Sequence, residues 1–258
     1  MPAARRATLA CLTTVLTVAP AALGAQVTTP APAGPRDVAT NTDAWFVYAG
    51  DYALAGRWAL LAEAEARRAD GLARWQQFLL RPALAYALAP GVRVTVGYEF
   101  QETWPYGAQP APARSAAHHL WEQVQLGHAT GRVAWQHRYR LEQRWVAVPL
   151  DTTTQDRRYT NRVRYQARAT VPLRGHMVDV GAPYLSAYDE VFVSWGRNVG
   201  RNVFDQNRAA AVLGWRLAAG TRLETGYMQQ LLFKGDGVHV ERNHTLLVTL
   251  AQSVRARR

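Results

Sequence analysis

The sequence has few of the residues that cross-link a small protein or anchor it through helices. Only Cys11 among the 258 residues is a cysteine, which excludes a disulfide-stabilised scaffold. Beyond residue 25 there is no run of about 20 apolar residues, which excludes a bundle of membrane-spanning helices. Lysine is also scarce: Lys234 is the only one, so arginine supplies 30 − 1 = 29 of the basic residues.

What the sequence does contain is apolar residues and positive charge. Hydrophobic residues make up 48% and aromatic residues 10%, which excludes a disordered chain. The 30 basic residues exceed the 19 acidic residues by 11. An excess of this size makes nucleic acid the first binding partner to consider.

Residues 1–25 have the composition of a secretory signal peptide. Arg5 and Arg6 precede an uncharged apolar run that ends in small residues, so we expect cleavage near Ala25. A membrane anchor is the alternative for this segment. Cleavage would remove two arginines and leave a net charge of 11 − 2 = +9. Residues 26–42 are rich in proline, threonine and alanine and predict a flexible linker.

From residue 43 onward, polar and apolar residues alternate with a period of two. The clearest example is the segment 132–144, in which Arg138 and Arg140 flank Tyr139. Successive side chains of a strand point to opposite faces, so this segment predicts a strand with one polar and one apolar face. In a helix the same arginines would spread around the whole cylinder.

The alternation predicts at least ten strands. They are expected near 57–68, 72–88, 91–103, 115–127, 131–147, 157–172, 176–194, 203–217, 221–233 and 239–251. Residues 43–50 have the composition of a further strand. Because bacterial single-chain barrels have even strand numbers, this segment is either a partial strand or plug, or one more strand exists. We therefore predict ten to twelve strands.

The connections between these strands alternate in length. Short ones are expected near 89–91, 127–131, 173–175 and 218–220, and long ones near 104–114, 149–156, 195–202 and 234–238. A transmembrane barrel has short periplasmic turns and longer outer loops, whereas a soluble sandwich has no reason to alternate. The predicted fold is an all-β, antiparallel transmembrane β-barrel over 43–252, with a basic tail at 253–258. A soluble periplasmic β protein is the alternative.

A barrel would place the polar strand faces in its interior, where charges must pair. The residues predicted for this lumen network are Glu63, Glu65, Arg67, Arg81, Glu99, Arg138, Arg140, Glu142, Arg144, Arg162, Arg164, Glu190, Gln206, Arg208, Arg222 and Glu224. Arginine suits pairing because its planar fork grips carboxylates. We expect an occluded lumen, with a narrow path for small anionic solutes as the alternative. Because carboxylates share these faces, the arginine excess no longer indicates nucleic acid.

Some outer-membrane barrels are enzymes with serine, histidine and acid groups near the outer rim. The candidates here are Ser115, His118 and His119, which follow the 104–114 connection. Adjacent residues of a strand point to opposite faces, so the two histidines cannot bind one metal ion. No phosphate loop or cysteine motif occurs, and we expect neither metal nor cofactor. We favour a non-enzymatic barrel, with a lipid-modifying rim enzyme as the alternative.

Several short motifs, in their order and spacing, are similar to those of a known family. They are Glu63-x-Glu65-x-Arg67, Phe78-Leu79-Leu80-Arg81-Pro82, Gly97-Tyr98, Trp121-Glu122-Gln123, the run from Arg138 to Arg144, Arg162-x-Arg164-Tyr165, Asp189-Glu190, the run from Phe204 to Arg208, and Gly226-Tyr227. Over about 43–252 the chain resembles the uncharacterised domain-of-unknown-function family DUF2490. The resemblance implies an outer-membrane β-barrel and no assigned activity. The chain departs from many outer-membrane proteins in that its last strand does not end on an aromatic residue, which leaves the end of that strand open.

These patterns together predict a location and partners. We expect a protein of the cell outer membrane that contacts outer-membrane lipids and the outer-membrane assembly machinery, and binds no nucleic acid. A monomer is the favoured oligomeric state.

Overall fold

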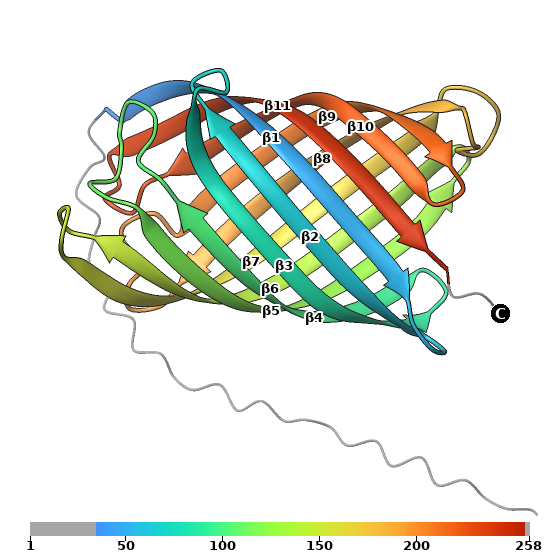
Figure 1. Ribbon diagram of the computed structural model, residues 1–258, viewed down its shortest axis with the longest axis horizontal. Coiled ribbons are helices and arrows are strands. Elements are labelled where there is room, and N and C mark those ends of the chain that lie inside the picture. Colours follow the sequence, from blue (N-terminus) through green and yellow to red (C-terminus); the bar gives the residue numbers. More distant parts are fainter. Residues whose placement is uncertain (1–34, 256–258) are drawn as a thin grey trace, which may run out of the picture. The chain divides into compact units, whose positions relative to one another are not determined.

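The computed structural model describes residues 35–255. This part of the chain consists of eleven long strands and the connections between them (Figure 1). They are β1 Asp37–Ala53, β2 Trp58–Ala69, β3 Arg74–Ala89, β4 Val92–Thr103, β5 Ser115–Thr130, β6 Val133–Pro149, β7 Gln155–Pro172, β8 Pro183–Trp195, β9 Phe204–Ala218, β10 Thr221–Phe233 and β11 His239–Val254. The predicted signal peptide, residues 26–34 of the predicted linker and the last three residues lie outside this part. No helix within it is long and apolar enough to cross a membrane.

The strands form one closed barrel in which each strand pairs with its neighbours in sequence, and β1 pairs with β11. The closing pair is parallel, with Asp37 opposite His239 and Tyr52 opposite Val254, and the other pairs are antiparallel. The predicted all-β barrel of ten to twelve strands is therefore confirmed, and it departs from an antiparallel arrangement at this one pair. The cause is the odd strand number, since after ten reversals the eleventh strand runs in the direction of the first.

Strand β1 accounts for residues 43–50, whose role the alternation left open. They are the middle of a 17-residue strand that begins at Asp37, within the predicted linker. This strand pairs along its length with β11 and, from Ala44 onward, with β2. The segment is thus a full wall strand rather than a plug or a partial strand.

The connections give the barrel two unlike ends. The short-turn mouth has two-residue turns at 90–91, 131–132 and 219–220, whereas the long-loop mouth has connections at 104–114, 150–154, 196–203 and 234–238. Pro90-Gly91 suits a tight turn because Gly91 has a φ of 73°, which glycine adopts without steric cost.

The predicted alternation of connection lengths fails at one place. Strand β8 begins at Pro183 rather than near residue 176, so residues 173–182 form a long connection at the short-turn mouth. Gly175 and Gly181 both have positive φ there, at 65° and 78°, a conformation that does not continue a strand.

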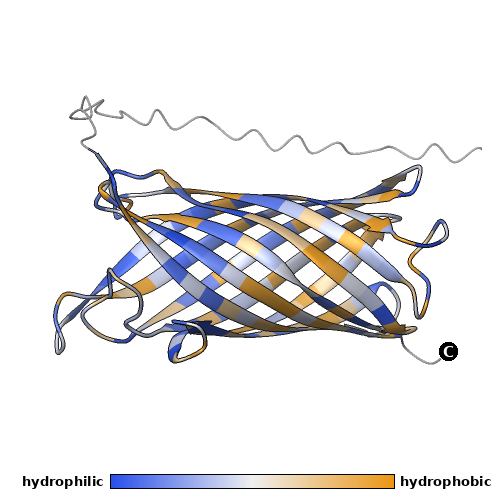
Figure 2. Ribbon diagram, turned by 90° about the horizontal axis from the view of Figure 1, so that it is seen from above, coloured by the Kyte–Doolittle hydropathy of each residue, from blue (hydrophilic) through white to orange (hydrophobic). Residues whose placement is uncertain are grey.

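Hydrophilic and hydrophobic residues are interspersed along the strands (Figure 2). Because successive side chains of a strand point to opposite faces, this alternation separates the interior of the barrel from its outer face. On β5, His119, Trp121 and Gln123 point inward and are buried. Leu120 and Val124, on the opposite face of the same strand, are 49% and 41% exposed. The polar side chains therefore converge on the lumen, where the candidate site lies.

Candidate functional site

The inward side chains of β2, β3 and β4 form an ion-pair cluster around Arg81. The Arg81 guanidinium contacts the carboxylates of Glu63, Glu65 and Glu99. Arg67 Nη2 adds an ion pair of 2.5 Å to Glu65. Glu65, Arg67, Arg81 and Glu99 are all buried, so these charges compensate one another away from water.

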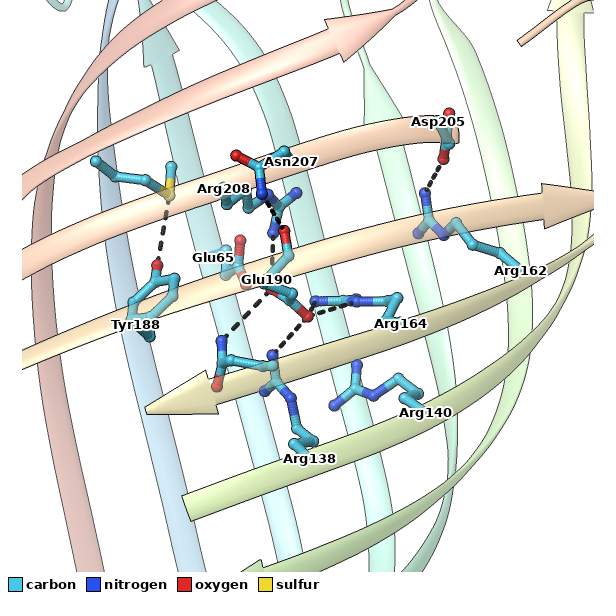
Figure 3. Close-up of polar contacts among 12 residues, drawn as sticks. Glu65, Arg138, Arg140, Arg162, Arg164, Tyr188, Glu190, Asp205, Asn207 and Arg208 are labelled. Carbon is cyan, nitrogen blue, oxygen red and sulfur yellow. Dashed lines mark hydrogen bonds and ion pairs between the residues drawn. The ribbon is translucent and has the colours of Figure 1, made fainter. Parts of the chain in front are cut away.

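A second cluster joins β6, β7, β8 and β9, and Figure 3 shows Arg138 and Arg164 directed at Glu190. Glu190 Oε1 lies 2.8 Å from both Arg138 Nη2 and Arg164 Nη2. Arg208 Nη1 lies 4.0 Å from Glu190 Oε2. Arg164 also reaches Glu142 at 2.8 Å, so one guanidinium links two buried carboxylates.

Arg162 extends this second cluster toward the long-loop mouth. Its Nη2 lies 2.6 Å from Glu142 Oε2, and its Nη1 lies 3.0 Å from Asp205 Oδ2. Arg144 lies 3.9 Å from the same Asp205 carboxylate.

Two further ion pairs reach across the lumen between strands that are not neighbours. Arg168 on β7 pairs with Glu224 on β10 at 2.5 Å, and Tyr184 donates a hydrogen bond of 2.8 Å to the same carboxylate. Arg93 on β4 pairs with Asp51 on β1 at 2.6 Å. Each of these pairs joins two strands that are separated by other strands of the wall. Their side chains therefore extend into the interior of the barrel.

Aromatic rings also point inward, which the alternation did not predict. Arg67 Cζ lies 3.6 Å from the ring centroid of Trp45, and Arg208 Cζ lies 4.8 Å from both Trp45 and Phe192. A guanidinium over an aromatic face gains a favourable cation–π interaction. Trp45 lies two residues after Asp43 and therefore on the same face of the strand. This spacing could have placed Trp45 in the lumen from the sequence alone.

Within residues 35–255 the filled lumen leaves at least three cavities. One of about 250 Å³ lies at the short-turn mouth, one of about 190 Å³ in the middle, and one of about 180 Å³ toward the long-loop mouth. Arg138 and Arg140 line both the first and the second, whereas Arg81, Arg164 and Arg208 line both the second and the third. Arginines of both ion-pair clusters thus line more than one cavity.

At the long-loop mouth, the 104–114 connection folds toward β1 and β11. Tyr106 donates a hydrogen bond of 2.8 Å to Glu241 on β11, which also pairs with Lys234. Burial and the neighbouring Glu241 carboxylate raise the pKa of Tyr106 well above its usual value, so its hydroxyl remains a donor. Gly107 packs so closely on Asn41 of β1 that a Cβ there would clash with it. This connection therefore partly covers the long-loop mouth.

The structure places the predicted lumen residues on the inward faces of the strands. Most of them are shielded from solvent, whereas Arg222 is exposed. Gln206 is buried, and in the orientation that satisfies its amide its oxygen accepts hydrogen bonds from Arg208 and Gln230. Arg222 is exposed at the short-turn mouth and has no ion pair within residues 35–255. The predicted set omitted Asp205, which pairs with Arg162, and Arg168, which pairs with Glu224. It also omitted both members of the Arg93–Asp51 pair.

Ser115, His118 and His119 do not converge. His118 lies on the outer face, 2.6 Å from the Tyr98 hydroxyl through its Nδ1. His119 is buried in the lumen with Nδ1 2.9 Å from Glu99 Oε1. No hydrogen bond joins Ser115 to either histidine in the described chain. The arrangement is not that of a serine–histidine–acid triad.

No group of three or more histidine, cysteine, aspartate or glutamate side chains within residues 35–255 is arranged to hold a metal ion. The arginines of the lumen can instead bind anions. Alternatively, the lumen side chains only fill the interior of the barrel.

Comparison with known proteins gives one result. The family model described as "Protein of unknown function (DUF2490)" matches residues 42–241. Neither the curated proteins nor the solved structures include a match to this chain.

Proposed function

Because the chain belongs to the DUF2490 family, whose function is unknown, we propose a role from the barrel itself: an integral outer-membrane protein whose lumen is closed by ion pairs. An apolar band on the outer face, bounded by two belts of aromatic residues, carries this proposal. Such belts flank the hydrocarbon layer in transmembrane barrels.

The two belts are formed mainly by aromatic pairs on, or directly next to, neighbouring strands. At the long-loop mouth the pairs are Trp75–Trp104, Trp145–Tyr159 and Phe204–Phe233, with ring centroids 5.3–5.4 Å apart. At the short-turn mouth Trp58 packs on Tyr86 at 4.8 Å, and Trp135 lies near the start of β6.

The distance between the belts fits a bilayer. Trp135 and Trp145 are ten residues apart on the outer face of β6. A rise of about 3.3 Å per residue and a tilt of about 40° separate them by roughly 25 Å along the barrel axis. An apolar band of that height is characteristic of outer-membrane barrels, and soluble monomers rarely expose so large an apolar surface.

Between the belts, large apolar side chains such as Leu80, Val96 and Val163 are exposed. Two outward carboxylates on the strands have amide partners: Glu122 accepts from Gln143 at 3.2 Å, and Asp189 from Asn207 at 3.1 Å. Pairing with an amide lowers the cost of a polar group on an apolar surface.

In the proposed orientation, the short-turn mouth faces the periplasm and the long-loop mouth faces outward. The partners are outer-membrane lipids and, during biogenesis, the assembly machinery. Closure by the β1–β11 pair leaves no free sheet edge, which favours a monomer.

The membrane proposal is tested by fractionation and by gel mobility. We expect the protein in the outer-membrane fraction. We also expect the unheated, detergent-folded protein to migrate differently from the boiled protein, because a closed barrel resists detergent unfolding. Recovery in the soluble periplasmic fraction, together with equal mobility of heated and unheated samples, would contradict the proposal.

The closed lumen predicts very low ion conductance. In planar bilayers we expect no stable open-channel currents, because the buried side chains of the Arg81 cluster and the Glu190 cluster fill the lumen. An open porin of known conductance, inserted under the same conditions, is the control. Sustained single-channel steps from this protein would show that the ion pairs leave a continuous path.

A further inference from the structure

The cavity at the short-turn mouth, which we call the basic vestibule, carries more positive charge than its carboxylates balance. Its charged lining consists of Arg81, Arg93, Arg138, Arg140, Arg222, Asp51 and Glu63. Five arginines against two carboxylates give 5 − 2 = +3. Each carboxylate already has a partner, since Asp51 pairs with Arg93 and Glu63 with Arg81.

The remaining three arginines of the vestibule are poorly compensated. Arg138 shares Glu190 with Arg164, and its Nε is buried without a hydrogen-bond partner. Arg222 lies at the rim and makes no hydrogen bond or ion pair to any residue that the structure describes.

Arg140 is the most deeply placed of the three. It is buried, and its Nε and Nη2 both donate to the neutral side-chain oxygen of Gln123, at 3.0 and 2.8 Å. The nearest carboxylate in an ion pair with it is Glu142, at 4.0 Å. Its guanidinium lies over the Trp121 ring, with Cζ 4.0 Å from the ring centroid. Packing on the indole fixes the guanidinium while leaving its charge unneutralised.

A second basic hollow continues the vestibule outward. It has a volume of about 520 Å³ and is lined by Arg216, Arg222 and Arg255, without a carboxylate among its lining residues. Arg222 and Ser253 line both hollows. A low-dielectric wall lined by one sign of charge concentrates counter-ions at its mouth.

We propose that the basic vestibule is a binding site for a small oxyanion of the phosphate type, held by Arg138, Arg140 and Arg222. Guanidinium forks match the oxygen geometry of phosphate. The charges of these arginines are only partly compensated, since Arg138 shares its carboxylate, Arg140 lies 4.0 Å from Glu142 and Arg222 has no ion pair within residues 35–255, and this favours the entry of an anion. The volume of about 250 Å³ accommodates such an anion with several waters. At its inner end the vestibule meets the Glu190 cluster through Arg138, which pairs with Glu190. This proposal does not rest on membrane insertion, because the vestibule belongs to the barrel itself.

Titration calorimetry of the full chain in a neutral detergent and phosphate-free buffer tests the site. Inorganic phosphate is the first probe, and glycerol 3-phosphate distinguishes a free anion from a phosphate ester. We expect saturable binding of one anion per chain. Arg222→Gln should weaken it about tenfold, the loss expected for a charge-assisted hydrogen bond.

Two variants separate a defined site from a general effect of charge. Arg174→Gln removes the same charge from the exposed 173–182 connection at the same mouth, outside the vestibule lining, and should leave affinity unchanged. Asp51→Asn frees Arg93 within the vestibule and should tighten binding several-fold. Absence of saturable binding to both probes, or equal losses in Arg222→Gln and Arg174→Gln, would overturn the proposal. Neither result would alter gel mobility or membrane fractionation.

Discussion

Replacement of Glu190 by glutamine should lower the free energy of unfolding by about 3–5 kcal/mol, the cost of removing one partner from a buried ion network. Glu190 is 2% exposed and accepts from Arg138 and Arg164, with Arg208 4.0 Å away. Glutamine keeps the volume of the side chain. It removes the negative charge and directs an amide NH₂ donor at guanidinium donors, so Arg138 loses its carboxylate partner and Arg164 keeps only Glu142.

Chemical denaturation in detergent micelles, followed by tryptophan fluorescence, measures this loss. Asp156→Asn is the matched control, since Asp156 pairs with Arg158 at 3.0 Å where both side chains are at least 41% exposed. That pair should contribute less than about 1 kcal/mol. Equal stability of Glu190→Gln and the wild-type protein would show that the lumen charges are hydrated and do not depend on one another.

Replacement of Leu80 by arginine should destabilise the barrel by about 2–4 kcal/mol in a lipid bilayer, the cost of a lipid-facing arginine near the midplane. Leu80 lies about midway along β3 between the belt residues Trp75 and Tyr86, and it is 42% exposed. In hydrocarbon the guanidinium loses its hydration and must distort the bilayer to regain it.

The same substitution in a water-exposed barrel would have almost no effect, because substitutions at exposed sites fall within about 0.5 kcal/mol. Unfolding of the protein refolded into liposomes therefore distinguishes the two environments. Leu150→Arg is the control, since Leu150 is 57% exposed in the 150–154 connection and outside the apolar band. Equal stabilities for Leu80→Arg and Leu150→Arg would remove the main support for membrane insertion.

Much of the wall was predictable because alternation is a local property. A strand places successive side chains on opposite faces whatever its partners are, so Arg138, Arg140 and Glu142 could be assigned to one face from the sequence. The two-residue turns were also predictable, as at Pro90-Gly91, because turn residues act within a few positions.

The closing strand and the connection at 173–182 were harder to predict. The inward face of β1 mixes Asp43 with Trp45 and Val47, which weakens the alternation and concealed a full strand. Whether residues 176–182 continue β8 depends on backbone conformation at Gly175 and Gly181, and no side-chain pattern reports that.

The sequence by itself determined which faces are polar, how many arginines and carboxylates share them, and the family to which the chain belongs. Only the tertiary structure decided which charges meet. Arg168 and Glu224 are 56 residues apart, and Arg93 and Asp51 are 42 apart, on strands that are not neighbours. Their contact follows from the stagger of the strands and from closure of β1 on β11, which set the height and direction of every inward side chain. For the same reason, only closure shows that Arg138, Arg140 and Arg222 share one cavity with too few carboxylates to neutralise them.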